Sequence, residues 1–219
     1  LNIGIDKSKI DISGSIACAA DEYQMQCFYD ESYNQDLNIK VRKKTDVLLI
    51  SQPFSNYSNY KKLWFKELES FINDCKDNNL SYKILMHPRD DISLLPSLVD
   101  RNSIIPSDKH IAILDLYGEI NNCRLVVIKS SSLVNSVIRL KVPIAHINYH
   151  NMQTTLDFKQ CTLNEMVLND RNGLGKIFTY LSQNSANVIT HQLKKSKKYG
   201  CVAYDYKFKQ LLSDLEIIK

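Results

Sequence analysis

Two short stretches of this 219-residue chain hold the side chains best suited to chemistry. The first, Met86-His87-Pro88-Arg89, combines an imidazole, a rigid proline and a guanidinium. The second, Lys129-Ser130-Ser131-Ser132, presents three hydroxyls in succession. Imidazole and guanidinium groups donate hydrogen bonds to phosphate oxygens, and serines that open a helix add unpaired backbone N–H groups that favour an anion. Together the two stretches predict a phosphate-binding site.

Both stretches also have a purely structural interpretation. A proline after His87 can simply end a strand, and one serine is enough to cap a helix. However, three successive serines exceed what a cap needs, and each stretch follows an apolar run that predicts a strand. Because ligands of open α/β sheets bind beyond the carboxyl ends of the strands, we expect both stretches to face one crevice. The candidate site residues are therefore His87, Arg89, Ser130, Ser131 and Ser132.

An acidic side chain could complete a nucleotide site by accepting hydrogen bonds from ribose hydroxyls. Asp115 is the candidate, because the strand-loop unit before the serines could bring its carboxylate into the same crevice. A cap for a helix over Leu116 to Ile120 is an equally good interpretation of Asp115. If that helix starts earlier, Glu119 is the substitute candidate.

Several classes of protein are disfavoured by what the sequence lacks. It contains neither G-x-G-x-x-G nor G-x-x-x-x-G-K-[ST], the phosphate loops of dinucleotide oxidoreductases and P-loop enzymes. Its five histidines show no metal-ligand spacing and it has no Asp-x-Asp pair, so we expect a site that needs neither a metal nor a cofactor. With 28 basic and 24 acidic residues, the net charge of +4 gives no support for nucleic-acid binding.

Alternating strands and helices would have to position these residues. Apolar runs bounded by turn residues predict buried strands at Asp46–Pro53, Ser81–Met86, Arg124–Ile128 and Pro143–Asn148. Apolar residues at helical spacing predict helices at Tyr60–Lys76, Ser130–Lys141, Leu163–Leu181 and Phe208–Leu215, the third with an interruption near Asn172-Gly173. This alternation predicts an α/β domain with a doubly wound parallel sheet.

The domain begins after a weakly patterned segment. We interpret residues 1–44 as the end of an upstream domain or a linker, and residues 45–219 as the α/β domain. The sequence starts at Leu1 without a methionine, so we expect an earlier part of the protein to be missing from it.

The cysteines and the hydropathy indicate a cytoplasmic protein. The six cysteines form no close pairs, which is typical of reduced thiols, and no apolar run approaches the length that spans a bilayer. The basic run Lys194–Lys198 predicts a solvated helix face or, as an alternative, a peripheral contact with anionic lipid on the inner face of the membrane.

Three motifs of the chain resemble the nucleotide-binding half of bacterial sialyltransferases. They are the strand-end run Leu48–Pro53, then His87-Pro88-Arg89-Asp90, then Ser130-Ser131-Ser132, and the similarity covers about residues 46–150. The resemblance implies a Rossmann-like fold, as in the C-terminal half of a GT-B glycosyltransferase. It also implies transfer of a sialic-acid-like sugar, with inversion, from a CMP donor to a surface glycan of the capsule or lipooligosaccharide.

The resemblance also assigns roles to residues. In that family the histidine of the His-Pro motif meets the CMP phosphate and assists its departure, which implies a catalytic role for His87. The serine motif binds the same phosphate, which implies that Ser131 and Ser132 bind the donor, with Ser130 and Arg89 beside them. An acidic residue upstream of the serines holds the ribose in these enzymes, and the resemblance gives this role to Asp115.

The general base of such enzymes has no clear counterpart here. Between the first strand and the His-Pro motif, the carboxylates on offer are Glu67 and Glu69, on an ordinary amphipathic helix. Capsule Kdo transferases and CDP-glycerol polymerases share related motifs, so a CMP-Kdo transferase or a CDP-alcohol phosphotransferase is an alternative. Because no base is visible, a non-catalytic module that binds a nucleotide or a partner protein is a further alternative.

Overall fold

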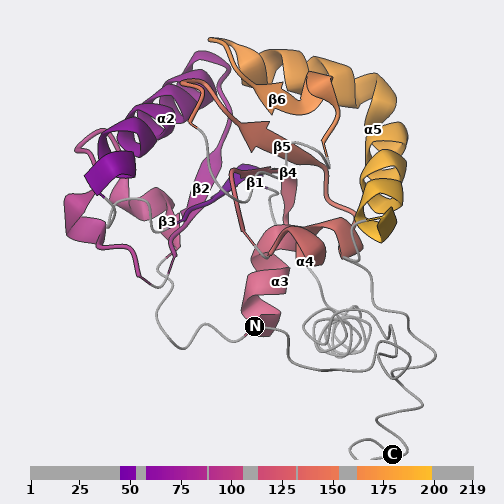
Figure 1. Cartoon of the computed structure of the whole chain (residues 1–219), viewed down its shortest axis with the longest axis horizontal. Helices are drawn as coiled ribbons and strands as arrows, with labels where there is room; N and C mark the ends of the chain where they lie inside the picture. The colour runs from indigo at the N-terminus through magenta and orange to yellow at the C-terminus, as the bar shows by residue number, and fades with distance from the viewer. Residues whose placement is uncertain are drawn as a thin grey trace, which may run out of the picture.

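The computed structural model describes residues 45–52, 58–87, 89–105, 113–131, 133–152 and 162–198. Its centre is a sheet in which every neighbouring pair of strands is parallel. The strands are β1 (Thr45–Ile50), β2 (Tyr82–Leu85), β3 (Ile104–Ile105), β4 (Cys123–Ile128), β5 (Ile144–Ile147) and β6 (Val167–Leu168). They lie in the order β3-β2-β1-β4-β5-β6 (Figure 1). This order confirms the doubly wound sheet predicted from the sequence.

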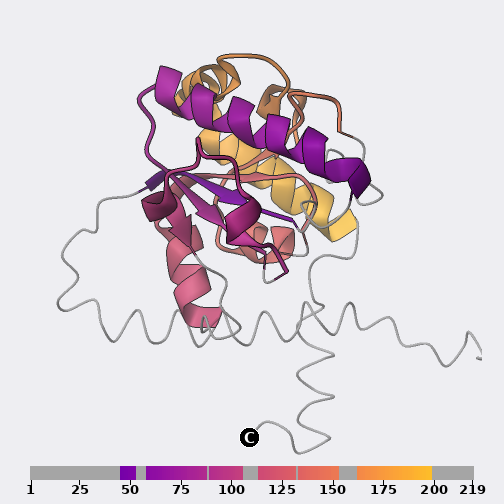
Figure 2. The ribbon, with the colours of Figure 1, turned by 90° about the vertical axis from the view of Figure 1, so that its left-hand side faces the viewer.

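Helices cover both faces of the sheet. The α-helices of the described chain are α2 (Ser58–Asp77), α3 (Ile113–Asn121), α4 (Val134–Arg139) and α5 (Gly173–Lys198). Short 3₁₀ helices lie in the connections, namely η3 (Ile92–Leu94), η4 (Arg101–Ser103) and η6 (Asn164–Met166). Helices α2 and α5 pack on one face, whereas α3 and α4 pack on the other (Figures 1 and 2).

Strand β1 shows why an unbroken apolar run folds at the centre of this sheet. Val47 and Leu49 pack with the side chains of α2 and α5, whereas Leu48 and Ile50 pack with those of α3 and α4. All four are at most 2% exposed. Because successive side chains of a strand point to opposite faces, a strand that is covered on both sides needs apolar residues throughout.

Helix α2 confirms the amphipathic helix predicted over Tyr60–Lys76. Its buried side chains recur at helical spacing and are at most 1% exposed, and they are Trp64, Leu68, Phe71, Ile72 and Cys75. Burial raises the pKa of the Cys75 thiol well above its usual range, so this thiol stays protonated and behaves as an apolar group. Cys75 and Cys123 are both buried thiols that form no disulfide with each other, as the cysteine spacing predicted.

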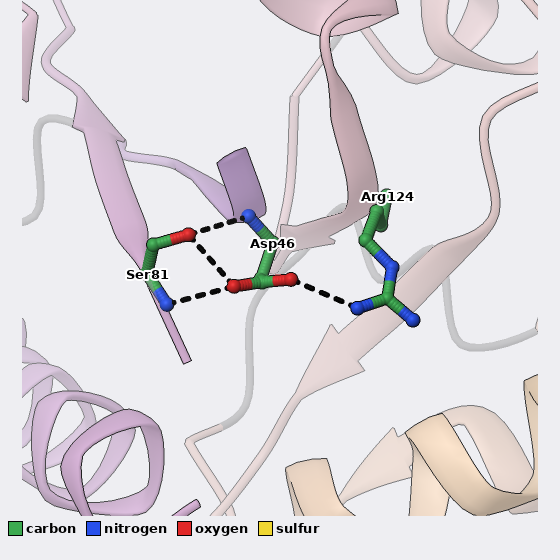
Figure 3. Close-up of polar contacts among 3 residues, drawn as sticks. All are labelled: Asp46, Ser81 and Arg124. Carbon is green, nitrogen blue, oxygen red and sulfur yellow. Dashed lines mark hydrogen bonds and ion pairs between the residues drawn. The ribbon is translucent and has the colours of Figure 1, made fainter. Parts of the chain in front are cut away.

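The amino ends of β1, β2 and β4 are joined through one carboxylate (Figure 3). Asp46 Oδ2 accepts hydrogen bonds from the backbone N–H of Ser81 at 2.9 Å and from its hydroxyl at 2.7 Å. Asp46 Oδ1 accepts from Arg124 at 2.9 Å. Burial acts to raise the pKa of Asp46, but these hydrogen bonds and the charge of Arg124 outweigh it and hold the pKa below its usual value.

The helix predicted over Leu163–Leu181 is wrong in its first half. Residues Asn164–Met166 form η6, Val167–Leu168 form β6, and α5 begins at Gly173. The short apolar run pairs with the free edge of β5 instead, where Leu168 O accepts the backbone N–H of Asn148 at 2.8 Å. Asn172 has a φ of 68°, a left-handed conformation through which an α-helix cannot run. None of the described helices is long and apolar enough to cross a membrane.

Candidate functional site

The candidate site lies where the parallel strands end at the carboxyl edge of the sheet. The chain leaves β1 toward β2 on one side and returns to β4 on the other, so the switch point of the topology lies between β1 and β4. Ser51 follows β1, His87 follows β2, and Lys129 and Ser130 follow β4. Because β2 and β4 are the two neighbours of β1, the structure brings the two predicted stretches to the same edge.

A hydrogen bond to the His87 ring determines which ring nitrogen carries the proton in the neutral imidazole. The backbone N–H of Arg89 donates to His87 Nδ1 at 3.1 Å, so Nδ1 is an acceptor and the neutral imidazole carries its proton on Nε2. Burial and the charge of Arg89 lower the pKa of His87 below 6.5, while the carboxylate of Asp90 acts in the opposite direction. His87 is thus a neutral hydrogen-bond donor at neutral pH, and a bound anion would favour its protonated form.

Asp90 fixes the loop that carries His87. Its Oδ2 accepts the hydroxyl of Ser51 at 2.8 Å and the backbone N–H of His87 at 3.4 Å. The backbone N–H of Asp90 donates in turn to the carbonyl of His87 at 2.8 Å. Asp90 therefore ties the ends of β1 and β2 together, as a positioning residue. Asp90 was not among the candidate site residues, although an aspartate three positions after a strand-end histidine is a typical turn residue.

The serine stretch lies at the same edge of the sheet, after β4, but is built differently from the prediction. The helix predicted to start at Ser130 starts at Val134, and its N-cap residue Leu133 makes no side-chain cap hydrogen bond. Ser131 forms a turn instead, in which its hydroxyl accepts the backbone N–H of Leu133 at 3.3 Å and its carbonyl accepts that of Val134 at 3.2 Å. Ser130 is buried and Ser131 is half-buried.

Helix α4 is consequently too short to supply much of the helix dipole that was expected to favour an anion at the serines. The serine hydroxyls and backbone groups of the turn remain as phosphate donors. Ser132 and Pro88 lie outside the described residues, as do residues 1–44 and the helix predicted over Phe208–Leu215.

The placement of Asp115 corrects one interpretation. It lies exposed in the first turn of α3, which starts at Ile113, so it does not cap a helix over Leu116 to Ile120. The substitute, Glu119, forms an ion pair with Lys83 on β2 at 2.7 Å. A ribose-binding role for Asp115 stays a prediction, and Glu119 is already engaged with Lys83.

Glu67 and Glu69, the two glutamates considered as general bases, both lie on helix α2. Glu67 is fully buried and accepts the backbone N–H groups of Tyr149 and His150 at 2.8 and 2.9 Å. These two hydrogen bonds use both oxygens of the Glu67 carboxylate to hold the loop after β5. Glu69 lies exposed on α2.

Lys129, which opens the serine stretch but was not among the candidate site residues, belongs to this edge. It directly precedes Ser130 and is fully buried. Its ammonium donates to Asn148 Oδ1 at 2.7 Å and lies 3.4 Å from His146 Nε2. The signal in the sequence was a lysine that immediately continues an apolar run, since lysines are rarely buried without a specific reason.

Two cavities are separate from the predicted phosphate site. One of about 500 Å³ lies beside the carboxyl-terminal half of α2 and is lined by Ser70, Asn73, Asp74, Asp77, Tyr149, His150, Asp170 and Arg171. Another of about 330 Å³ lies near the amino end of β4, beside Arg124 and Phe178. Within the described part of the chain, no group of three or more His, Cys, Asp or Glu side chains is placed to hold a metal ion.

A parallel sheet in this strand order, with helices on both faces and polar loops at its switch point, defines a Rossmann-like α/β domain. The predicted fold class is confirmed. No family model matches the chain, and no curated protein matches it by sequence. Solved structures do match it.

Three solved structures illustrate the likeness. Methanocaldococcus jannaschii UDP-GlcNAc 2-epimerase, in complex with UDP-GlcNAc and UDP, gives a TM-score of 0.53 at 14% identity over 82% of this chain and 50% of its own. The wall teichoic acid polymerase TagF, as the H444N variant with CDPG, gives 0.53 at 18% identity over 97% and 50%. S. aureus MnaA with UDP gives 0.51 at 11% identity over 98% and 56%.

These matches concern the fold alone, because all three identities are at most 18%. The chain spans about half the length of the solved structures that it matches.

Proposed function

We propose that this chain is the nucleotide-binding half of a glycosyltransferase-type enzyme, and that the donor phosphate binds at the carboxyl edge between the loops after β2 and β4. The observation that carries the proposal is the hydrogen bond from Arg89 N–H to His87 Nδ1, which leaves the proton of the imidazole on Nε2. The nucleotides named for the matched structures add support, since UDP-GlcNAc, UDP and CDPG all carry phosphate.

The finer proposal concerns the donor. The motif resemblance favours a CMP-activated, sialic-acid-like sugar and a glycan acceptor of the capsule or lipooligosaccharide. In this scheme Arg89, Ser130, Ser131 and Ser132 bind the phosphate, and Asp115 binds the ribose. Contact of the basic segment Lys194–Lys198 with a membrane surface belongs to the same proposal.

The reaction would be a single displacement. An acceptor hydroxyl attacks the anomeric carbon and loses its proton, while the bond from that carbon to the CMP phosphate breaks through an oxocarbenium-like state. Negative charge accumulates on the departing phosphate, where His87 Nε2 and the serine turn donate hydrogen bonds. One well-placed donor of this kind lowers the barrier by roughly 3–4 kcal/mol.

A second candidate is a CDP-alcohol phosphotransferase, which the likeness to TagF with CDPG favours. There the phosphorus is attacked and the phosphate stays with the transferred group. A CMP-Kdo transferase shares the first mechanism. A non-catalytic nucleotide-binding module remains the alternative from another class, because neither Glu67 nor Glu69 is placed as a base.

Titration calorimetry of the chain with CMP, CDP, UDP and GDP tests the proposal. We expect the cytidine nucleotides to bind and GDP not to bind. Stronger binding of CDP than of CMP would favour the phosphotransferase. If none of the four nucleotides binds to the folded chain, the proposed function is wrong.

A further inference from the structure

The cavity near the amino end of β4 is not part of the proposed donor site. It measures about 330 Å³ and lies between the start of β4, the connection from α4 to β5, and α5. This volume is within the range of small-molecule sites in proteins. Strand β4 separates the cavity from the donor site by roughly 15–20 Å, because Arg124 lies near the amino end of the strand and Ser130 follows its carboxyl end. A ligand in this cavity would therefore leave the donor site open.

One wall of the cavity is apolar. It includes side chains from the α4–β5 connection and from one face of α5, namely Leu140, Val142, Pro143, Phe178, Leu181 and Ile189. Four of them are buried, whereas Phe178 and Ile189 are half-buried. An alkyl group that enters the cavity would remove apolar surface of Phe178 and Ile189 from water, which favours binding.

The rim of the cavity is polar and basic. Its side chains are exposed, and they are Asn121, Arg124, Lys141, Ser182 and Ser185. The lining thus contains two cations and no aspartate or glutamate. An apolar wall with a few polar groups at its rim fits a ligand that has an anion at one end and an alkyl group at the other.

Arg124 is held in place but keeps hydrogen-bond donors for a ligand. Its Nη1 donates to Asp46 Oδ1 at 2.9 Å, whereas the other terminal nitrogen points away from Asp46 (Figure 3). The guanidinium carbon lies 4.8 Å from the centre of the Phe178 ring. A guanidinium has five N–H donors, so this ion pair leaves most of them available. Because Asp46 and Phe178 already fix Arg124, binding an anion costs little additional side-chain entropy.

Lys141 supplies the net positive charge of the rim. Asp46 balances the charge of Arg124, whereas Lys141 forms no ion pair with any residue that the structure describes. Lys141 follows the C-cap of α4 with a φ of 56°, the left-handed conformation that commonly ends a helix. Its backbone N–H donates to the carbonyl of Ile138 at 3.0 Å. The backbone of Lys141 is therefore fixed, while its exposed ammonium is available to an anion.

We propose that this cavity binds a phosphate group that carries an alkyl chain. The phosphate lies at Arg124 and Lys141, and the chain packs against Phe178, Leu181 and Ile189. Phosphate suits this rim because its several oxygens accept hydrogen bonds from a guanidinium and an ammonium together. The site goes beyond the proposed function and does not depend on which nucleotide the donor site takes. Two sources share this chemistry, namely a soluble alkyl phosphate and the head group of an anionic lipid.

NMR titration of the isotopically labelled chain with hexyl phosphate tests the site, with inorganic phosphate and hexyl glucoside as partial ligands. We expect hexyl phosphate to shift the backbone amides of Lys141, Val142 and Ser185. It should bind about tenfold more tightly than either partial ligand. From ethyl to butyl to hexyl phosphate, the affinity should rise about two- to fourfold for each CH₂ that is buried. Shifts confined to Ser130 and Ser131 would place the phosphate in the donor site and overturn the inference.

A charge variant and a matched control test the role of the rim. Lys141→Gln removes the ammonium and keeps a long polar side chain. Lys66→Gln removes the same charge from an exposed position of α2 that does not line the cavity. We expect Lys141→Gln to weaken hexyl phosphate binding about fivefold and Lys66→Gln to weaken it less than about twofold. Thermal unfolding verifies that both variants are folded, and equal affinities in the two would contradict the proposal.

Vesicles distinguish the two sources of the phosphate. If the ligand is a lipid head group, the chain should co-sediment with vesicles of phosphatidylcholine and phosphatidic acid, and Lys141→Gln should reduce this binding more than Lys66→Gln does. Binding of hexyl phosphate in the cavity without binding to these vesicles supports the site with a soluble alkyl phosphate as its ligand. If hexyl phosphate does not bind to the folded chain, the inference is wrong. That result leaves the proposed function intact, because binding of CMP tests the proposed function separately.

Discussion

The backbone N–H of Arg89 lies 3.1 Å from Nδ1 of His87 and donates a hydrogen bond to it. This contact joins residues two positions apart at the end of β2 and selects one tautomer of the ring. It leaves Nε2 as the donor of the imidazole, in the part of the sheet where phosphate groups bind in doubly wound folds.

The first prediction is that His87 titrates at a lower pH than an ordinary histidine. Burial and Arg89 lower it below 6.5, so we expect ¹⁵N NMR to show the Nε2–H tautomer at pH 7 and protonation at a lower pH than in an unstructured peptide. Because the unfolded chain binds this proton more readily, the stability from neutral His87 is present above pH 6.5 and is lost as the pH falls through the folded pKa. A His87 that titrates above 6.5 would contradict the assignment.

Asp90 should act on His87 through both charge and position. The carboxylate raises the pKa of His87, so Asp90→Asn should lower that pKa further. Asp90→Ala also removes the acceptor of Ser51 and should destabilise the fold by about 1–3 kcal/mol, the range for a partner left unsatisfied.

NMR titration and denaturant unfolding measure the two effects. Asp91→Asn is the matched control, because the exposed Asp91 bonds to Ser93 in the following turn and does not contact Ser51 or His87 in the hydrogen bonds described. A pKa of His87 that moves equally in both Asn variants would show that Asp90 has no specific effect.

The serine turn should contribute to binding but little to stability. Ser130→Ala combined with Ser131→Ala should weaken CMP binding by about 1–3 kcal/mol, the range for hydrogen bonds to a charged group. Calorimetry measures the loss, and the exposed Ser185 on α5, replaced by alanine, serves as the control. Unchanged CMP affinity in the folded double variant would remove these serines from the site.

Asp46 should make the sheet sensitive to acid. Its pKa is held below 3.8 in the folded protein, so the stabilisation is present above that value and is lost as the pH falls through the folded pKa. Asp46→Asn should lower the free energy of unfolding by about 1 kcal/mol at pH 7, a modest figure because the group is partly solvated. The difference between the variant and the unsubstituted protein should shrink below pH 3.8 in denaturant titrations. A difference that stays constant with pH would contradict this account.

The sheet could be predicted from the sequence because its strands are buried on both faces. In β1 and β4 every central position is apolar, and a short continuous apolar run of this kind is typical of a buried parallel strand. Strand β6 has two residues, too few to show a period, and its pairing depends on the free edge of β5. Pairing with β5 therefore determined the secondary structure of Val167–Leu168, a segment whose local sequence pattern also fitted a helix.

The candidate site was harder to predict, for physical reasons. The local structure at Asp115 stayed open because Leu116, Tyr117 and Ile120 fit a strand or a helix until the face against which they pack is known. The serines were expected to cap a helix that starts at Ser130. That helix starts at Val134 instead, and the Ser131 hydroxyl accepts the backbone N–H of Leu133 in the turn before it. The burial of Lys129 was not expected because lysines are usually exposed, and its hydrogen bond to Asn148 joins the ends of two different strands.

The most direct test of the central claim is an NMR titration of the isotopically labelled chain with CMP, with cytidine as the reference for base and ribose alone. The account predicts that CMP, and not cytidine, shifts the Nε2 resonance of His87 and the backbone amides of Ser130 and Ser131. Shifts confined to the amino edge around Asp46 and Arg124, or no difference between CMP and cytidine, would contradict a phosphate site at the carboxyl edge.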